Sequence, residues 1–548
     1  MMTRSCMGRL LLAAAIAMTS CGRPKQADLI VYNALVYTVD SAFSTAEAFA
    51  VQDGRFIAIG TSDEIRTNYK AAETIDAHGK PVYPGFYDAH AHFTGFAQTF
   101  GQADLTGAKS FEEVIDRLKA FRTEYPNTTW LRGRGWDQNL WENQTFPDRE
   151  KLDEVFPEIP VYLVRIDGHA AIANGRALKL AGIQSPMTVT GGVIEVKNNR
   201  LTGMLIDNAM GLVASKIPEY TTADLTKMLH QAETECFAVG LTTVSDAGLN
   251  QRNIKLLDSL YLTGALRIRN HAMAGFSEKN LRHYLAKGPY VSERFTVRTF
   301  KLFADGALGS RGACLLEPYA DAPTSGFLLS SIAAIDSAIA RIAASDFQLA
   351  THAIGDSANR VILNIYGKYL QGKNDRRWSI EHAQVIAPQD FEKFEAYSII
   401  PSVQPTHATS DMYWAMDRLG PERVKGAYAY RQLLSETGLL ALGSDFPVEH
   451  INPLYGFHAA IARVDQNGYP NSGFQPENAI SREAALRGMT CWAAYAKFEE
   501  DKRGSIEVGK KADFVMLAAD IMTAPEESLR DIDVLRTAIN GETAYQRN

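Results

Sequence analysis

The chain has 548 residues, a formal net charge of -7, and a composition that is 46% hydrophobic and 22% charged. One compact core rarely extends over so many residues, so we expect a large domain with a smaller one appended. The hydrophobic fraction is typical of a globular protein and excludes a largely disordered chain. Lys and Arg form no runs that would make a positive patch for phosphate backbones, so we expect no nucleic-acid partner.

The first residues have the pattern of a bacterial export signal. Two arginines and a following apolar run predict a signal peptide over residues 1–20. Met18-Thr19-Ser20-Cys21 resembles a lipobox, in which the cysteine becomes the lipidated first residue of the mature protein. Leu is usual where Met18 stands, and ordinary cleavage after Ala15-Ile16-Ala17 is the alternative. Both predict export to the cell envelope or periplasm, and Gly22 favours a lipoprotein that is anchored in the outer membrane through Cys21.

Both ends of the remaining chain are rich in short strands. Residues 28–59 alternate strand patterns with turn signals, including Asp53-Gly54 between two apolar runs, and residues 504–517 do the same. Neither end has enough apolar residues for a core of its own. We therefore expect residues 21–82 and 500–548 to pair into one small β-sandwich domain.

The middle of the chain, residues 83–499, alternates apolar runs rich in β-branched residues with helical patterns. This alternation predicts a parallel sheet built from βα units, and eight runs match the strand count of an α/β fold, the (β/α)8 TIM barrel. The runs lie near 81–88, 241–246, 266–272, 296–303, 347–351, 378–381, 399–403 and 439–443. The first two are further apart than one βα unit requires. We therefore expect an inserted subdomain at about 98–236, with helices at 111–123 and 222–238.

Histidine and aspartate side chains follow the ends of these runs. They end the first, fifth, sixth and eighth runs: His90, His92, His352, His382 and Asp445. The carboxyl ends of barrel strands meet on the face where TIM barrels carry active sites. His90 and His92 are two residues apart on an extended segment, so their side chains point the same way and can bind one ion. A single histidine at a strand end is usually a satisfied polar residue, but this ordered set predicts a metal site.

Lys301 lies in the fourth run among apolar neighbours that predict a position inside the barrel. Its ammonium group has no lone pair and cannot bind a cation. A buried, deprotonated lysine can add carbon dioxide to form a carbamate, which behaves as a carboxylate able to bridge two ions. The alternative for Lys301 is an ion pair with Asp305.

Five motifs in chain order resemble the amidohydrolase superfamily and, within it, the YtcJ-like branch of family-3 amidohydrolases. They are Pro84-Gly85-Phe86-Tyr87-Asp88-Ala89-His90-Ala91-His92, Lys301 to Arg311, Thr351-His352-Ala353-Ile354-Gly355-Asp356, Ile380-Glu381-His382-Ala383-Gln384 and Gly443-Ser444-Asp445-Phe446-Pro447-Val448. The resemblance implies two divalent ions, commonly zinc, bridged by a carbamate on Lys301. It also implies that His90, His92 and Asp445 hold one ion, and that His352 and His382 hold the other.

The expected function is metal-dependent hydrolysis of non-peptide carbon–nitrogen bonds in small amide-type substrates. A water between two dications ionises near neutral pH, and the hydroxide attacks the substrate carbonyl. Asp445 lies beside this hydroxide if it is also a ligand, so it can take the proton and pass it to the leaving nitrogen.

Four further residues are candidates for substrate contact. Asp167-Gly168-His169 in the insertion matches a family signature, and His169 would reach over the barrel mouth to the substrate carbonyl. The alternative is a turn in which Asp167 caps a nearby helix. Arg311 can bind a substrate carboxylate bidentately or pair with Glu317. His407 follows the seventh strand and faces the same mouth.

Other functions stay open beside this one. A deaminase of the same superfamily would carry a glutamate three residues after the fifth-strand histidine, where this chain has Gly355. An esterase or lactonase would use the same polarised carbonyl, and a non-catalytic lipoprotein would keep the site to bind a ligand. The substrate stays open among N-acyl amino acids, formamides, cyclic amides and small dipeptides. Homodimers are the most common oligomers of soluble proteins, so a homodimer is the oligomer to expect.

Overall fold

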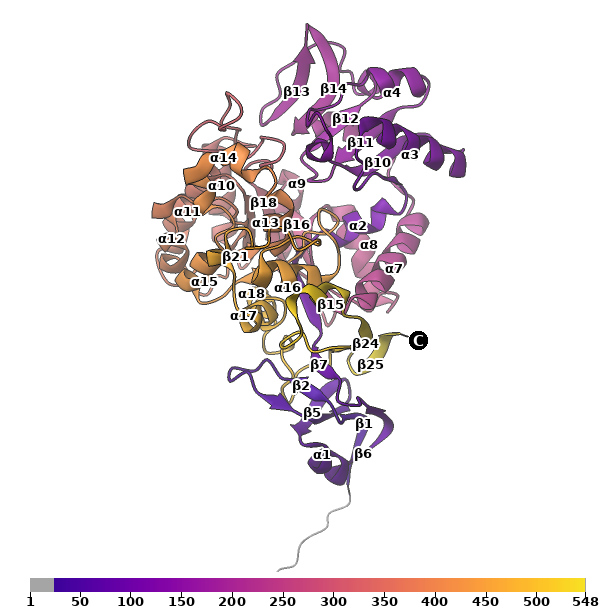
Figure 1. Ribbon diagram of the computed structural model, residues 1–548, viewed down its shortest axis with the longest axis vertical. Helices are drawn as coiled ribbons and strands as arrows, with labels where there is room; N and C mark the ends of the chain where they lie inside the picture. The colour runs from indigo at the N-terminus through magenta and orange to yellow at the C-terminus, as the bar shows by residue number, and fades with distance from the viewer. Residues whose placement is uncertain (1–23, 548) are drawn as a thin grey trace, which may run out of the picture.

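The structure of the protein, a computed structural model, describes residues 24–547. The predicted signal peptide and the lipidation candidate Cys21 lie outside the described residues. Along the longest axis the molecule has three tiers (Figure 1). The insertion after the first barrel strand is at the top, the barrel is in the middle, and small sheets from the chain ends are at the bottom. The barrel mouth therefore faces the insertion.

Eight parallel strands form the barrel. They follow one another in chain order: β8 (Phe86–Ala91), β15 (Leu241–Leu249), β16 (Arg269–Gly275), β18 (Phe295–Phe303), β19 (Gln348–Ala353), β20 (Ser379–His382), β21 (Ile400–Val403) and β22 (Ala441–Leu442). The first and last are joined just past their ends, where Asp445 N donates to His90 O and His92 N donates to Phe446 O, both at 2.8 Å. The predicted α/β fold class is thus confirmed, with a nearly closed barrel.

Helices surround the barrel, and several begin where a polar side chain caps the first turn. Asn250, Ser277 and Ser331 each accept a hydrogen bond from the backbone N–H three residues later. The helices are α2 (Phe93–Thr99), α7 (Thr222–Ala238), α8 (Gln251–Leu262), α9 (Glu278–Lys287), α10 (Ile332–Ala343), α11 (Asp356–Leu370), α12 (Glu392–Ala396), α13 (Pro405–Asp411), α14 (Ala415–Arg423), α15 (Tyr430–Thr437), α16 (Pro453–Ala462), α17 (Arg482–Gly488) and α18 (Cys491–Ala496). Helix α7 buries Leu225 and Leu229 in the barrel core.

The first predicted barrel run is divided between two sheets. Its beginning, β7 (Pro81–Pro84), pairs with β2 (Leu35–Tyr37) and β23 (Phe514–Leu517) outside the barrel, and the barrel strand starts only at Phe86. Gly85 lies at the break, where a Cβ atom would overlap the side chain of Thr242. The prediction of one strand from residue 81 was therefore wrong, because the chain leaves one sheet and enters another at this glycine.

Two small sheets pack at the lower end of the barrel. One contains β5 (Arg55–Gly60), β4 (Ala48–Gln52), β1 (Lys25–Tyr32) and β6 (Tyr69–Asp76), with α1 (Ser62–Asn68) before its last strand. The other contains β25 (Glu542–Gln546), β24 (Val534–Ile539), β23, β7, β2 and β3 (Thr45–Ala46), so it combines both chain ends. Phe49 and Phe514 meet in the core between the sheets. The predicted turn at Asp53-Gly54 joins β4 to β5, and both residues have positive φ.

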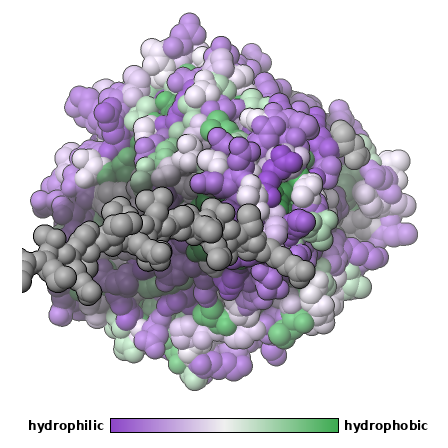
Figure 2. All heavy atoms as spheres, turned by 90° about the horizontal axis from the view of Figure 1, so that it is seen from below, coloured by the Kyte–Doolittle hydropathy of each residue, from purple (hydrophilic) through white to green (hydrophobic). Residues whose placement is uncertain are grey.

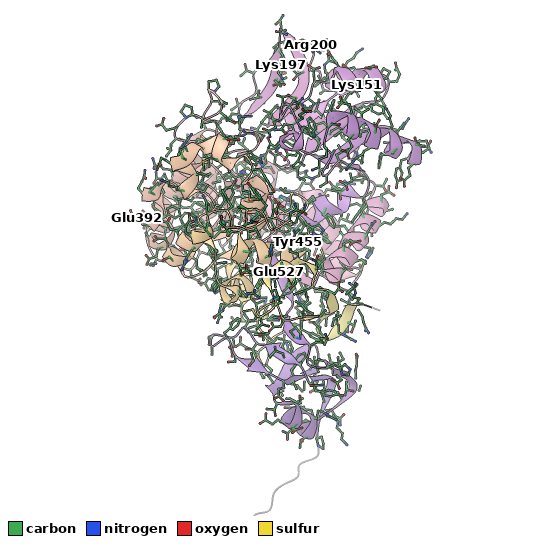
Figure 3. The ribbon with its side chains drawn as sticks, in the orientation of Figure 1. Lys151, Lys197, Arg200, Glu392, Tyr455 and Glu527 are labelled. Atoms are coloured by element: carbon green, nitrogen blue, oxygen red, sulfur yellow. The ribbon has the colours of Figure 1, made fainter. Side chains whose placement is uncertain are left out.

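The insertion folds around a six-stranded sheet of its own. Its strands are β13 (Gly192–Lys197), β14 (Arg200–Asp207), β12 (Ala170–Ala173), β11 (Val161–Arg165), β10 (Leu131–Trp136) and β9 (Ala103–Asp104), and its helices are α3 (Phe111–Glu124), α4 (Glu150–Val155), α5 (Gly175–Leu180) and α6 (Met210–Ala214). Along β12, Ile172 packs in one core while Ala171 and Ala173 pack in another, so both faces of the sheet are covered. Lys151, Lys197 and Arg200 lie at its outer end, away from the barrel (Figure 3).

The lower end of the molecule has a mainly hydrophilic surface. In the view from this end, hydrophobic residues are scattered among hydrophilic ones (Figure 2). Within residues 24–547, no helix combines the length and the apolar character needed to cross a bilayer.

Candidate metal centre and active site

Three predicted metal ligands meet where the first barrel strand lies beside the last. The Nε2 atoms of His90 and His92 lie 3.4 Å and 3.0 Å from Oδ1 of Asp445. One side-chain ligand atom from each residue lies within 4.8 Å of the other two. Oδ1 of Asp445 is buried but has no well-aligned hydrogen bond from any described residue, although two imidazole nitrogens approach it. A shared cation would satisfy all three groups, so these residues fit a divalent metal site.

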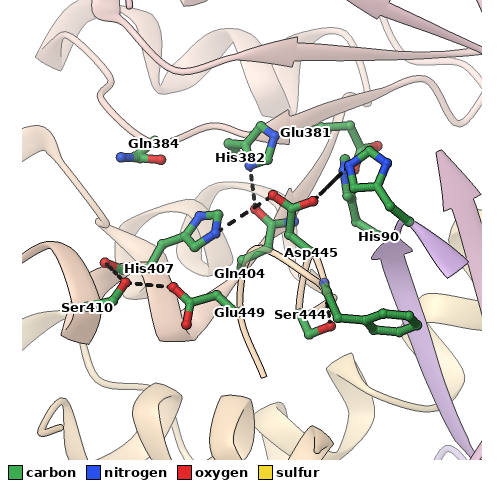
Figure 4. A network of polar contacts seen from close by, with 12 residues as sticks. His90, Glu381, His382, Gln384, Gln404, His407, Ser410, Ser444, Asp445 and Glu449 are labelled. Atoms are coloured by element: carbon green, nitrogen blue, oxygen red, sulfur yellow. Dashed lines mark hydrogen bonds and ion pairs between the residues drawn. The ribbon is translucent and has the colours of Figure 1, made fainter. Parts of the chain in front are cut away.

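Each of three histidines is fixed by an oxygen atom on its Nδ1 side. His90 Nδ1 hydrogen-bonds the buried carboxylate of Glu381, and His92 Nδ1 lies 3.1 Å from the carbonyl oxygen of Ala247. His382 Nδ1 lies 2.8 Å from Oε1 of Gln404 (Figure 4). An Nδ1–H donated to oxygen leaves the Nε2 lone pair available, which is the usual arrangement of metal-binding histidines.

His352 is oriented the other way. Its Nε2 lies 3.3 Å from the carbonyl oxygen of Gly306, which leaves Nδ1 as its available atom. The ring centroids of His352 and His382 are 4.6 Å apart, and those of His90 and His382 are 5.1 Å apart. The structure therefore brings all four predicted histidine ligands into one cluster.

Burial keeps three of these imidazoles neutral. It lowers the pKa of His90 to about 4 and holds the pKa values of His352 and His382 well below the usual value. A metal ion binds only the neutral imidazole. The imidazoles of His90, His352 and His382 can therefore bind a cation at neutral pH without first losing protons.

Lys301 lies at the centre of this cluster. Its buried Nζ is 3.3 Å from Nε2 of His90, and burial lowers its pKa to about 8. It forms no ion pair within the described part of the chain. The carboxylate of Asp305 instead accepts the backbone N–H groups of Cys314, Ile354 and Gly355. A buried amine with a lowered pKa is the form that can add carbon dioxide, so Lys301 fits the bridging carbamate.

Glu381 is a functional residue that the sequence did not single out. It lies within a quoted motif, but its carboxylate turns away from its neighbour His382 and holds His90. Burial alone would raise the pKa of Glu381, yet His90 keeps it well below its usual value. Adjacent residues on a strand point to opposite sides, which could have indicated a supporting role.

His169 reaches the cluster from the insertion. The centroid of its ring lies 4.9 Å from that of His352, and its Nδ1 is 2.7 Å from Oδ1 of Asp207 on β14. Burial opposes protonation, but the hydrogen bond and charge of Asp207 raise the pKa of His169. Asp167 accepts the backbone N–H of His169 and pairs with Arg165. The N-cap of helix α5 is Asn174, not Asp167.

His407 lies on the opposite side of the cluster. Its Nε2 is 3.8 Å from Oδ2 of Asp445 and has no hydrogen-bond partner among residues 24–547, and its ring stacks on that of His382. Ser410 donates to Glu449 beside it (Figure 4). His407 is therefore placed to contact a group bound next to Asp445.

Arg311 lies away from this site. Its guanidinium pairs with Asp321 through Nη2 at 2.7 Å and Nε at 3.2 Å, and Glu317 is not its partner. The loop after β18 turns back on itself, with Arg311 at a φ of +61°, and Arg311 is not among the described residues that line the cavity. Arg134, which the sequence did not single out, lines the cavity instead.

A cavity of about 1740 Å³ lies between the insertion and the barrel. The metal cluster forms its floor, and Arg134, Asp167 and His169 of the insertion belong to its wall. The interior is large enough for a drug-sized molecule. The site therefore consists of a metal-binding floor below a polar wall that the insertion supplies.

Known proteins resemble this chain over most of its length. The sequence profile of the amidohydrolase family matches residues 73–545. The protein YtcJ of Bacillus subtilis (strain 168) is 30% identical over 95% of this chain and 99% of its own length. The N-substituted formamide deformylase of Arthrobacter pascens is 28% identical over 95% of this chain and 98% of its own.

A solved structure is similar to this protein over most of both chains. An uncharacterized metal-dependent hydrolase from Pyrococcus horikoshii OT3 superposes with a TM-score of 0.75 at 27% identity, and the match covers 91% of this chain and 99% of the other. The profile match, the relatives and the barrel with its strand-end histidines agree. The chain belongs to the amidohydrolase family, a family of hydrolases.

Proposed function

We propose that this protein is a metal-dependent hydrolase of non-peptide carbon–nitrogen bonds in small amide-type molecules. The observation that carries the proposal is the orientation of the histidines. His90, His92 and His382 each have Nδ1 fixed by an oxygen atom, which leaves Nε2 available at the floor of a large cavity. The relative from Arthrobacter pascens, a deformylase of N-substituted formamides, supports an amide as the substrate.

The proposed cofactors are two divalent ions, with zinc as the first choice, and a carbamate on Lys301. His90, His92 and Asp445 would hold one ion, His352 and His382 the other, and the carbamate both. Bound ions would lower the pKa of a water molecule and polarise the substrate carbonyl. The described chain supplies the neutral imidazoles and the buried amine that this arrangement requires.

The remaining residues handle protons and position the substrate. Asp445 would take a proton from the attacking water and deliver it to the leaving nitrogen. His169, with Nδ1 occupied by Asp207, would direct Nε2 to the substrate carbonyl oxygen as it gains negative charge. His407 would contact the leaving group beside Asp445.

The deaminase alternative is disfavoured by backbone packing. Gly355 stands where a deaminase would carry its glutamate, and a Cβ atom here would overlap the carbonyl oxygen of Cys314. The loop therefore has no room for a larger side chain. Esterase or lactonase activity uses the same floor and stays a second candidate.

One experiment separates these functions. The zinc-loaded protein is assayed against N-substituted formamides, N-acyl amino acids, matched esters and lactones, and aminopyrimidines, while metal content is measured by mass spectrometry. We expect about two ions per chain and faster hydrolysis of amides than of the matched esters. Bound metal without turnover of any compound would indicate a ligand-binding protein, and release of ammonia from aminopyrimidines alone would indicate a deaminase.

The cellular setting is a separate proposal. We propose an exported lipoprotein anchored in the outer membrane through Cys21, with a homodimer as its oligomer. Radiolabelled palmitate should be incorporated into the wild type and not into Cys21→Ser. Sedimentation of the protein without its first 23 residues would give the oligomeric state.

A further inference from the structure

Arg134 lies on β10 of the insertion and lines the cavity above the metal cluster. Its Nη2 donates to the carbonyl oxygen of Ile166 at 3.1 Å. Both Nη atoms lie 3.5 Å from the position that a Cβ atom would take on Gly168. The next residue in that loop, His169, packs against the metal-ligand candidate His352. The guanidinium therefore lies beside Gly168, the residue that precedes His169 at the edge of the expected reaction centre.

This guanidinium keeps most of its hydrogen-bonding capacity. An arginine has five N–H donors. Within the described structure, the guanidinium of Arg134 donates one hydrogen bond, which goes to Ile166. Its buried Nε has no partner there. No carboxylate lies within ion-pair distance of it in residues 24–547. A half-buried cation with unpaired N–H donors lowers the stability of the fold unless a ligand accepts hydrogen bonds from it.

The other arginines that line the cavity are already occupied. Arg165 donates to Gln138 and pairs with Asp137 and Asp167. Arg530 stacks on the ring of Tyr455, with its guanidinium carbon 3.9 Å from the centroid. Among the arginines that line the cavity in the described residues, Arg134 is the one whose guanidinium has a buried nitrogen without a hydrogen-bond partner.

The nearest carboxylates help to keep Arg134 charged, but none of the described residues pairs with it. Burial lowers the pKa of its guanidinium, and the charges of Asp445 and Asp167 oppose that shift. Asp167 is already paired with Arg165, and the charge of Asp445 would be shared with any cation bound there. A carboxylate of a bound substrate would therefore give Arg134 the counter-charge that it lacks within the described residues.

We propose that Arg134 binds a carboxylate of the substrate through its unused N–H donors, so that the preferred substrates are amides that carry a carboxylate, with N-acyl amino acids as the class. Guanidinium and carboxylate match in a bidentate geometry. This inference rests on the proposed amide hydrolysis and adds the recognition element for which the sequence suggested Arg311.

The test pairs charged and neutral ligands on the zinc-loaded protein. Substrates are N-formyl and N-acetyl amino acids and their primary amides, which lack the carboxylate. Arg134→Gln should raise KM for the carboxylates about 10-fold to 100-fold, leave kcat nearly unchanged, and leave kcat/KM for the neutral amides unchanged. Arg134→Lys should retain part of the affinity, because the charge remains but the bidentate fork does not. Arg132→Gln is the matched control, since Arg132 lies two residues away on β10 with its guanidinium over Tyr220.

A binding measurement keeps the inference separate from turnover. N-methylsulfonyl amino acids lack the scissile carbonyl, so calorimetry reports their affinity without hydrolysis. Tighter binding of the carboxylate form than of its amide, lost in Arg134→Gln and kept in Arg132→Gln, supports the role even if no tested amide is hydrolysed. If the wild type binds the carboxylate ligand and its amide with equal affinity, the inference is overturned. It is also overturned if Arg134→Gln and Arg134→Lys each weaken the binding of both ligands equally. Neither result affects the proposed hydrolysis.

Discussion

The Nδ1 atom of His169 lies 2.7 Å from Oδ1 of Asp207, and both residues belong to the insertion. Because Asp207 occupies Nδ1, the Nε2 atom is the one available to a substrate, on a ring that packs against His352. The proposed role of His169 thus depends on a carboxylate from a strand that contributes no metal ligand.

This pair gives the first prediction. His169→Gln should lower kcat about 100-fold, and Asp207→Asn should lower it about 10-fold by releasing the ring. The double variant should lose no more than His169→Gln alone, because both changes act through one group. Steady-state kinetics on an amide substrate measures all three. Additive losses would show that Asp207 acts independently.

Asp445 should affect turnover more than metal content. Asp445→Asn keeps an oxygen ligand at the site but removes the proton acceptor, so kcat should fall at least about 100-fold. Metal analysis of the same preparation should show that most of the metal is retained. An Asn variant with wild-type kcat would remove Asp445 from proton transfer.

Lys301 should carry a carbamate in the metal-loaded protein. Carbon-13 NMR of protein equilibrated with labelled bicarbonate should show a carbamate signal that is absent in Lys301→Gln. The variant should also bind about one ion instead of two, because the bridging ligand is lost. An unmodified Lys301 beside two bound ions would contradict the proposed bridge.

Glu381 should set the metal affinity through His90. Glu381→Gln keeps the size of the side chain but weakens the hydrogen bond to Nδ1, so metal affinity should fall about 10-fold to 100-fold. Competition with a fluorescent chelator gives the dissociation constant. Asp390→Asn is a suitable control, because Asp390 pairs with Arg360 and Lys393 at a distance from the cluster.

A buried ion pair between the barrel and the C-terminal strands should govern stability in acid. Arg269 and Asp513 are both buried, with Nε 2.6 Å from Oδ2. Burial opposes ionisation of Asp513, but the charge of Arg269 holds its pKa below the usual value. The pair therefore stabilises the fold above the unfolded-state pKa of about 4, and that contribution is lost as pH falls through the lower folded-state value.

Asp513→Asn tests this relation. At pH 7 the variant should lose about 3 kcal/mol, because Arg269 is left buried without its partner. The difference in unfolding midpoint between wild type and variant should shrink below about pH 4. A difference that stays constant with pH would show that packing, not charge, is lost.

The sequence predicted the barrel and the floor of the site because both depend on periodicity. Parallel strands place their carboxyl ends at one face, so His90, His352, His382 and Asp445 had to meet once the strands were recognised. Contacts between loops are different. Arg311 pairs with Asp321 because of the turn after β18, and no periodic pattern in the sequence predicts that turn.

Arg134 and Glu381 were missed for related reasons. Arg134 matters because most of its N–H donors have no partner within the described residues, and such an absence cannot be predicted from a motif. Glu381 matters because its strand neighbours that of His352 and its side chain turns toward His90. The break between strands at Gly85 could not be predicted, because apolar residues continue on both sides of it.

The sheet that joins both chain ends affects the order in which the molecule can fold. Strand β7 lies between β2 and β23, so its second edge stays unpaired until the last part of the chain has been synthesised. The barrel strand β8 begins just after β7. A ribosome-bound chain that lacks its C-terminal strands thus exposes an open strand edge just before the barrel strand that carries His90, a state prone to aggregation. Completion of the sheet at the base of the barrel is in this way linked to synthesis of strand β23.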